Sequence, residues 1–196
     1  MKLIGLTGGI GCGKTTVLNH FRKLGVPCFV ADSHAAGFYN EPDFLRQVRQ
    51  LLGPSVINPD NTANKQNIAN IVFNDKAKLL QLNSIIHPRV MTDFQIWAQS
   101  HDAATPYVII ESAILFEYNL HLQLDAVIAV YLEKEERLRR LELRDKVSRL
   151  ELEARMRNQL PAEEKMDRAD YVILNYEGNP RARQVATIDQ KIKQTL

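Results

Sequence analysis

The sequence predicts an α/β fold, in which a parallel sheet is flanked by helices and extended by helical segments. Two observations point to this class. Short apolar runs of strand length alternate with stretches of helical periodicity, and the first run ends at a cluster of glycines that precedes a helical stretch. Strands that alternate with helices in this way form parallel sheets through right-handed crossovers.

The N-terminal segment shows the pattern most clearly. Lys2 to Thr7 is an apolar run of strand length, and apolar residues recur at helical spacing between Lys14 and Leu24. Gly25 lies where a helix is expected to stop, and Val26 to Val30 is a second strand-like run. This order of strand, glycine turn, helix and strand predicts a βαβ unit.

Three further apolar, β-branched runs bring the number of predicted strands to five. They are Tyr107 to Ile110, Ala126 to Leu132 and Tyr171 to Leu174. Five strands separated by helical patterns predict a doubly wound core. We assign this core to residues 1–32, 104–135 and 168–196.

The gap between the second and third predicted strands is about seventy residues, far longer than an ordinary crossover. Helical periodicity runs through it, over Asp43 to Leu52, Lys65 to Phe73, Lys76 to Ile86 and Met91 to Gln99. We therefore expect a helical, substrate-binding insert at residues 33–103.

A second helical segment separates the fourth and fifth predicted strands. Lys134 to Lys146 carries dense alternating charge, and Arg149 to Leu160 is a helical stretch that stops before Pro161. We interpret residues 136–167 as a helical lid.

Composition excludes several classes of protein. The chain has 196 residues, of which 45% are hydrophobic and 24% charged, as expected of one globular domain. A net charge of +2 is too weak to indicate nucleic-acid binding, and no apolar run reaches membrane length. The two cysteines, Cys12 and Cys28, give neither a disulfide framework nor metal-ligand spacing. We expect a cytoplasmic protein with small-molecule partners and no obligate protein partner.

The most specific motif is GGIGCGKT, from Gly8 to Thr15, which lies between the first predicted strand and the first predicted helix. It matches the P-loop pattern, in which backbone N–H groups and a helix N-terminus converge on phosphate oxygens. Lys14 is predicted to hold the β- and γ-phosphates, and the Thr15 hydroxyl to bind Mg²⁺. The expected fold is therefore a P-loop NTPase-type five-stranded parallel sheet.

Cys12 lies inside this motif and allows two interpretations. A helix N-terminus lowers the pKa of a thiol, which would permit a redox role. A small side chain at a free position of the loop is the simpler interpretation.

A P-loop indicates only that a nucleoside triphosphate binds. GTPase switches carry an Asn-Lys-x-Asp motif, whereas the nearest string here, Asn64 to Asn67, lacks the carboxylate that reads guanine. A nucleic-acid motor needs basic grooves or a second nucleotide-binding half, for which this chain leaves little room. A small-molecule kinase that uses ATP fits better.

Two carboxylates follow predicted strands. Asp32 lies at the carboxyl end of the second strand, where ligands bind in open α/β sheets, and it could take the proton of an acceptor hydroxyl. Its alternative role is the N-cap of a helix that begins near Ser33. Glu111 closes the third strand and could hold Mg²⁺ through water, the alternative being a strand-end charge in solvent.

Arg140 and Arg144 lie four residues apart on a predicted helix, with Arg137 one turn earlier. They therefore share a face that could close over the triphosphate and stabilise its negative charge. A solvated face opposite the packed residues Leu138 and Leu141 is the alternative, and the helical spacing is compatible with both.

Taken together, these features resemble the dephospho-CoA kinase family. The shared strings occur in one order: LTGGIGCGKTT, Ala31-Asp32, His87-Pro88, Leu115-Phe116-Glu117, Arg140-x-x-x-Arg144-Asp145, Gln159, Glu164-Lys165 and the run from Ala169 to Asn175. The similarity extends over essentially the whole chain.

The resemblance implies transfer of the γ-phosphoryl group of ATP to the ribose 3′-hydroxyl of dephospho-CoA, which gives coenzyme A and ADP in the last step of coenzyme A synthesis. It implies that Asp32 is the base, that Arg140 and Arg144 act from the lid, and that the insert holds the acceptor. His87 is expected either near the acceptor or as a cap of the helix after Pro88.

The resemblance also implies which residues contact ATP. Those in the loop are Gly9, Ile10, Gly11, Cys12, Gly13, Lys14, Thr15 and Thr16. Asn175 is expected near the adenine ring.

The chain departs from the family at one loop. The family often has a proline ahead of its Leu-Leu-Phe-Glu string, whereas residues 111–117 read ESAILFE here. Without the proline, the backbone of this loop is expected to be freer. Two alternatives to the implied function remain: a kinase of another small acceptor, such as a nucleoside monophosphate or a sugar acid, and a nucleotide-dependent switch or binding module.

Overall fold

The computed structural model describes residues 1–145 and 147–195, so that Lys146 in the predicted lid and the C-terminal Leu196 lie outside the described residues. The chain divides into two compact units. One comprises Met1–Val30 and Ala98–Leu196, and the other comprises Ala31–Trp97. The second unit comprises most of the segment predicted as a helical insert, residues 33–103, together with Ala31 and Asp32.

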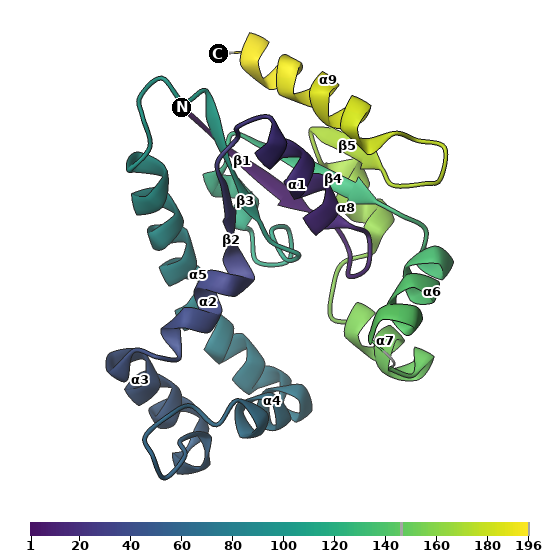
Figure 1. Cartoon of the computed structure of the whole chain (residues 1–196). Helices are drawn as coiled ribbons and strands as arrows, with labels where there is room; N and C mark the ends of the chain where they lie inside the picture. The colour runs from purple at the N-terminus through teal and green to yellow at the C-terminus, as the bar shows by residue number, and fades with distance from the viewer. Residues whose placement is uncertain (146, 196) are drawn as a thin grey trace. The chain divides into compact units, whose positions relative to one another are not determined.

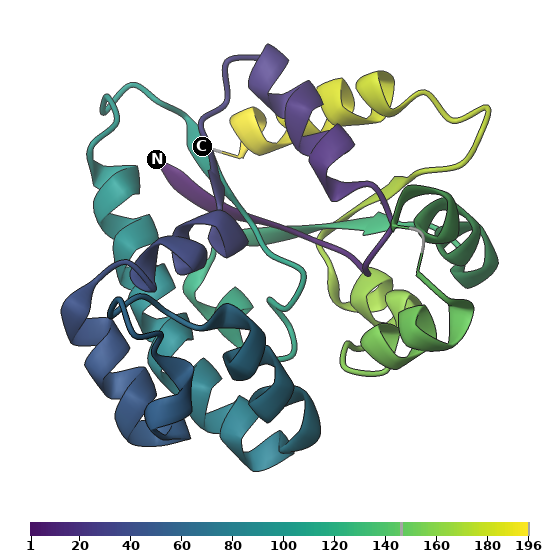
Figure 2. The same ribbon diagram turned by 60° about the horizontal axis from the view of Figure 1, so that its bottom comes forward.

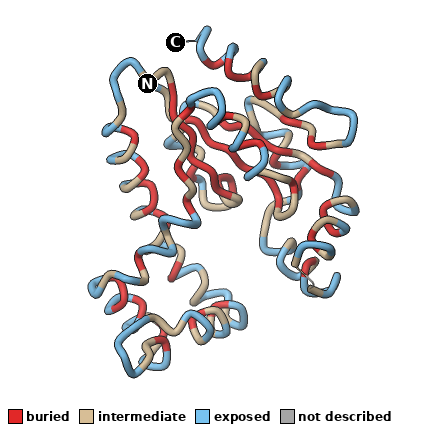
Figure 3. The backbone as a smooth tube through the Cα atoms, viewed as in Figure 1, coloured by how far each residue is buried: buried red, intermediate tan, exposed pale blue. Residues whose placement is uncertain are grey.

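The first unit is built on a five-stranded sheet in the order β2-β3-β1-β4-β5, in which every neighbouring pair is parallel (Figure 1). The strands are β1 (Lys2–Thr7), β2 (Cys28–Val30), β3 (Tyr107–Glu111), β4 (Ala126–Tyr131) and β5 (Tyr171–Leu174). The predicted class and all five strands are confirmed. Figure 3 shows buried residues concentrated along these strands, as expected of a parallel sheet covered on both faces.

The predicted second strand began two residues too early, at Val26. The Val26 N–H donates to the Phe21 carbonyl and the Gly25 N–H to the Arg22 carbonyl, while Gly25 has a φ of 81°. These bonds form a Schellman motif that ends α1 (Lys14–Lys23). The Val26 N–H is therefore used to end α1, and the strand starts at Cys28.

Helices α1 and α9 (Arg181–Gln194) lie side by side over one face of the sheet (Figures 1 and 2). Their apolar faces and the strands below them form one core, to which α1 contributes Val17, Leu18 and Phe21, and α9 contributes Val185, Ile188 and Ile192. A buried polar contact also joins the layers, because the Tyr107 hydroxyl donates to Asp189 over 2.7 Å.

The segment predicted as a lid forms α6 (Lys134–Asp145) and α7 (Arg149–Met156), which pack together through Leu138, Leu141 and Leu152. Ser148 begins α7 with a capping box that includes Glu151. The helix ends at Met156 rather than Leu160. A further short helix, α8 (Ala162–Arg168), was not predicted; it contacts β4 and covers the opposite face of the sheet from α1 (Figure 2).

The insert contains α2 (Ala31–Phe38), α3 (Pro42–Leu52), the 3₁₀ turn Pro54–Val56, α4 (Lys65–Asn74) and most of α5 (Lys76–Gln99). The helices expected at 43–52 and 65–73 are confirmed. α2 begins at Ala31, directly after β2, so Asp32 lies inside its first turn. The interpretation of Asp32 as the N-cap of a helix starting near Ser33 is therefore wrong.

The prediction of two separate helices at 76–86 and 91–99 is also wrong, because α5 continues through Pro88. A proline inside a helix removes one backbone hydrogen bond at a cost of about 3 kcal/mol. Burial on both sides of the proline offsets this cost, since Leu82, Val90 and Phe94 are all buried. His87 lies in mid-helix, so it does not cap a helix that starts after Pro88.

Within the part of the chain that the structure describes, we find no helix with both the length and the hydropathy of a membrane span.

Candidate active site

The P-loop leads from β1 into α1 at the carboxyl end of the sheet. Its glycines are required by geometry: Gly8, Gly11 and Gly13 have φ values of 147°, 81° and 93°. A Cβ on Gly8 would also come within 2.5 Å of the Val130 carbonyl oxygen. Gly13 is the N-cap of α1 and supplies no capping side chain, so the first N–H groups of this helix remain free to bind an anion.

Lys14 and Glu111 meet at the mouth of this loop. The Lys14 Nζ donates to the Gly8 carbonyl over 3.1 Å and lies 3.8 Å from Oε1 of Glu111. Glu111 ends β3 between β1 and β2, in register with Leu6 and Val30, and is 7% exposed. The interpretation of Glu111 as a strand-end charge in solvent is therefore wrong.

The predicted metal-binding residues are compatible with Mg²⁺. Within residues 1–145 and 147–195, no group of three His, Cys, Asp or Glu residues could form a protein-only metal site. Mg²⁺ beside a polyphosphate needs only one or two protein oxygens, because water and phosphate oxygens complete its shell. The exposed Thr15 hydroxyl at the start of α1 and the buried Glu111 carboxylate are ligands of this kind.

Asn175, directly after β5, connects this strand to the P-loop through hydrogen bonds. Its side-chain amide donates to the Cys12 carbonyl over 2.6 Å, and its backbone N–H donates to the Tyr131 carbonyl over 2.9 Å. Arg181 donates to the Asn175 side-chain oxygen. Asn175 is buried and packs so closely on Gly13 that any Cβ there would collide with it. This contact was not predicted, and the expected contact with adenine stays a prediction.

The Cys12 side chain is fully buried within the loop. Burial raises the pKa of its thiol, and the nearby positive charges of Lys14, Arg137 and Lys165 oppose this shift only in part. Because the thiolate is the reactive form, a raised pKa argues against a redox role. The structure favours the simpler interpretation, a small side chain that fits the loop.

Three of the arginines of α6, Arg137, Arg140 and Arg144, have different surroundings, although helical spacing assigns them to one face. Arg140 donates to Glu136 over 2.8 Å and to the Asn175 carbonyl over 3.5 Å. Arg144 pairs with its neighbour Asp145, and its side chain is 66% exposed. Arg137 is buried against the P-loop, where its guanidinium occupies the space that a side chain at Gly9 would need.

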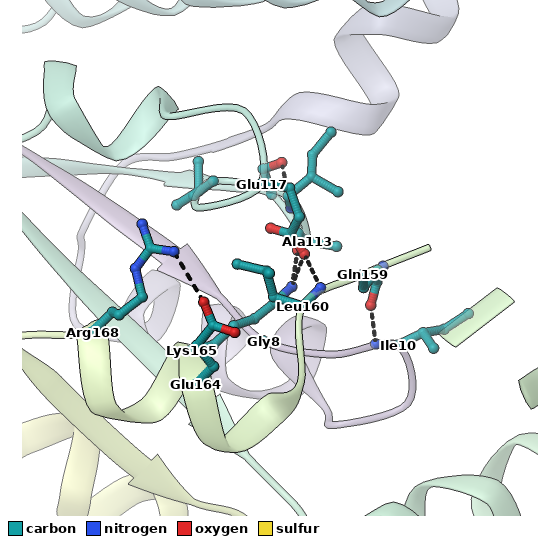
Figure 4. A network of polar contacts seen from close by, with 12 residues as sticks. Gly8, Ile10, Ala113, Glu117, Gln159, Leu160, Glu164, Lys165 and Arg168 are labelled. Carbon is teal, nitrogen blue, oxygen red and sulfur yellow. Dashed lines mark hydrogen bonds and ion pairs between the residues drawn. The ribbon is translucent and has the colours of Figure 1, made fainter. Parts of the chain in front are cut away.

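A buried polar network joins the P-loop to the segments around α8 (Figure 4). The Lys165 Nζ lies 2.6 Å from Oε1 of Glu117 and donates to the Ala113 carbonyl over 2.5 Å. The same Glu117 oxygen accepts from the Leu160 N–H over 2.9 Å. One residue earlier, the Gln159 side chain accepts from the Ile10 N–H of the P-loop over 3.0 Å.

Sequence reasoning noted Glu117, Gln159 and Lys165 only as parts of matching strings. A lysine on a short charged helix is normally expected in solvent, yet Lys165 is 0% exposed. Burial lowers the pKa of its amine, and the ion pair with Glu117 opposes this shift. The network therefore holds the loop after β3, the approach to α8 and the P-loop in one arrangement.

A pocket of about 820 Å³ opens beside Asn175, between α6 and the segment that links β5 to α9. Its lining residues are Leu132, Glu136, Arg139, Arg140, Tyr176, Glu177, Gly178, Asn179, Pro180 and Arg181. The lining thus combines apolar and aromatic side chains with three arginines and two glutamates.

Asp32 and His87 belong to the insert, whereas Lys14, Thr15, Glu111, Asn175 and the arginines of α6 belong to the first unit. The Asp32 side chain is exposed, and His87 is 8% exposed. Burial lowers the pKa of His87 to about 4, so its ring is neutral at physiological pH. The roles of these two residues toward an acceptor stay predictions.

A parallel sheet with a P-loop after its first strand, a helical insert after its second and a buried carboxylate facing the loop lysine defines a P-loop kinase. The chain belongs to the dephospho-CoA kinase family, whose sequence profile matches residues 2–180.

Individual relatives agree with this assignment. A Leptospira interrogans protein named dephospho-CoA kinase is 39% identical over 176 residues, which cover 88% of this chain and 84% of the relative. The crystal structure of TT1252 from Thermus thermophilus is similar with a TM-score of 0.86 and 30% identity over 97% of this chain and 96% of that chain. Dephospho-CoA kinase from Campylobacter jejuni has a TM-score of 0.68 and 25% identity over 98% of each chain.

Proposed function

We propose that this protein transfers the γ-phosphoryl group of ATP to the ribose 3′-hydroxyl of dephospho-CoA, giving coenzyme A and ADP. Membership of the dephospho-CoA kinase family supports the reaction and the acceptor. The observation that carries the proposal is the pairing of Lys14 with the buried Glu111 at the P-loop, 3.8 Å apart. A cation and a carboxylate in this position suit a triphosphate and its metal.

For ATP, we propose that the loop from Gly9 to Thr16 surrounds the phosphates and that Lys14 exchanges its bond to Gly8 for the β- and γ-phosphate oxygens. The pocket beside Asn175 is proposed to hold the adenine ring. Tyr176 and Pro180 offer it apolar surface, and Arg140 offers a planar cation for stacking.

For Mg²⁺, the proposed ligands are the Thr15 hydroxyl and, through water, Glu111. Bound there, the ion would neutralise charge on the β- and γ-phosphates. Because Glu111 is buried by the sheet, its carboxylate is held in one place and is shielded from bulk water.

For the acceptor, we propose that the insert binds dephospho-CoA and that Asp32 receives the proton of the attacking hydroxyl. Asp32 lies two positions after Val30, the last residue of β2, and ligands of open α/β sheets bind beyond the carboxyl ends of the strands. Its side chain is exposed and thus available to a substrate. His87 is buried in α5, which suits it to shaping the insert.

Arg140 and Arg144 are proposed to stabilise the negative charge that develops during transfer. Arg140 already lies beside Asn175, and Arg144 would have to exchange its pairing with Asp145 for the substrate. We place the reaction in the cytoplasm, where thiols stay reduced, because Cys12 and Cys28 are both free.

The test is ADP release by the purified protein with Mg²⁺-ATP and a panel of acceptors: dephospho-CoA, nucleoside monophosphates and gluconate. We expect strong stimulation by dephospho-CoA alone, with coenzyme A as product. Stimulation by another acceptor instead would reject the substrate and keep the kinase, and ADP release that no acceptor changes would reject both.

A further inference from the structure

Arg137 is a buried cation at the P-loop. It lies in α6 and is 7% exposed, and its guanidinium packs against Gly9, where a Cβ would come within 2.2 Å of an Arg137 Nη atom. Its Nε is buried and has no hydrogen-bond partner among the residues that the structure describes. Helix α6 also packs Leu141 against Gly11, which fixes the helix on this side of the loop.

The other cations around the loop have carboxylate partners. Lys14 lies near Glu111, and Lys165 pairs with Glu117. On α6 itself, Arg139 and Arg140 share Glu136, and Arg144 pairs with Asp145.

Arg137 differs from all of these. No Asp or Glu of the described residues lies within ion-pair distance of it. A buried charge without a counter-charge is strongly unfavourable. The position of the Arg137 guanidinium at an anion-binding loop therefore points to a bound ligand that supplies the negative charge.

We propose that Arg137 is a further phosphate-binding residue of the nucleotide site, which contacts the terminal phosphates of ATP from the α6 side of the loop. The inference rests on the proposed use of ATP. It assigns to Arg137 a role of its own, whereas helical spacing only grouped Arg137 with Arg140 and Arg144 on one face. Arginine suits this role because its planar fork can bind two phosphate oxygens at once. The nucleotide thus provides the counter-charge that the protein does not.

A packing role for Arg137 makes opposite predictions. If the side chain only fills space, Arg137→Met should lower the melting temperature of the ligand-free protein and leave the preference for ATP over AMP unchanged. If it serves the phosphates, removing an uncompensated buried charge should leave that melting temperature unchanged or raise it, while ATP binding weakens.

The experiment measures the binding of ATP and AMP by calorimetry and the melting temperature of the whole chain, without an acceptor. The variants are Arg137→Met, Arg137→Gln and the control Arg149→Gln, which removes an exposed arginine paired with Glu135. We expect Arg137→Met and Arg137→Gln to weaken ATP binding about tenfold, the loss of a charge-assisted contact. Binding of AMP, which lacks the terminal phosphates, should change little, and the control should match the wild type.

An unchanged ratio of ATP to AMP affinity in the Arg137 variants would overturn the proposal. If Arg137→Met does not fold, Arg137→Gln decides the same question with a polar side chain. Failure of the proposed kinase function would appear separately, as an absence of turnover with dephospho-CoA by a wild-type protein that still binds ATP.

Discussion

The side-chain amide of Asn175 donates a hydrogen bond to the carbonyl oxygen of Cys12 over 2.6 Å. This bond connects the end of the edge strand β5 to the middle of the P-loop, across 163 positions of sequence. The conformation of the phosphate-binding loop is therefore supported by a strand that lies two places away from β1 in the sheet.

We predict that Asn175→Asp disturbs the P-loop. A carboxylate at this position would face the Cys12 carbonyl with no proton to donate, so a buried hydrogen bond becomes a repulsion. We expect a loss of about 1–3 kcal/mol in the free energy of unfolding, together with weaker ATP binding. Urea unfolding and calorimetry measure both. The exposed Asn158→Asp serves as the matched control, and equal effects of the two substitutions would contradict the prediction.

The Lys165–Glu117 pair makes a second prediction. Lys165→Met leaves the buried Glu117 carboxylate without its cation and should cost about 3–5 kcal/mol of stability. Replacing both residues, as Lys165→Met with Glu117→Leu, should recover much of this loss, because no unpaired charge remains. Urea denaturation of the two single variants and the double variant gives the coupling energy. Additive effects would mean that the two side chains do not stabilise each other.

His87 predicts a pH dependence of stability. An unfolded histidine binds a proton below about pH 6.5, whereas burial lowers the pKa of folded His87 to about 4. Between these values the unfolded state binds more protons, so the free energy of unfolding falls as the pH is lowered, by up to about 1.4 kcal/mol per pH unit. The stabilisation is fully present above pH 6.5.

This dependence can be isolated by comparing variants. Melting curves between pH 4 and 7 should show a smaller loss for His87→Gln than for the wild type, whereas replacement of the exposed His34 should leave the slope unchanged. The same slope in His87→Gln and wild type would assign the acid sensitivity to other groups.

Substitutions of Asp32 and Lys14 should have different effects on turnover and on ATP binding. Asp32→Asn is expected to lower kcat about a hundredfold or more while ATP still binds, because general-base groups contribute that much. Lys14→Ala should weaken both ATP binding and turnover, since its amine is proposed to bind the phosphates. The exposed Asp43→Asn, in the same insert as Asp32, provides a control. Full turnover by Asp32→Asn would remove this residue from the mechanism.

Much of the fold was predictable because the information is local. Each strand of the sheet is a short apolar run, and the glycines of the P-loop mark a turn whose φ values other residues rarely adopt. The place of Glu111 at the carboxyl end of β3 was expected from the position of the apolar run before it, whereas its ion pair with Lys14 was not predicted.

What was missed depends on tertiary packing. Pro88 signals a helix boundary in isolation, but the burial of residues on both sides carries α5 through it. The short helix α8 has a charged sequence with little apolar periodicity, and its lysine is buried only because Glu117 lies opposite. Likewise, helical spacing places Arg137, Arg140 and Arg144 on one face, but the depth of each side chain depends on the neighbouring loop.

The register of the sheet has a consequence for synthesis on the ribosome. β1 emerges first, yet its partners are β3 and β4, so that Lys2 pairs with Tyr107 and Thr7 with Ala129. Gly8 packs on the Val130 carbonyl, and the Cys12 carbonyl accepts its hydrogen bond from Asn175, so both contacts need residues that are made much later. A nascent chain therefore exposes its glycine-rich loop for most of translation without the contacts that support it, and the contact with Asn175 can form only after β5 has been made.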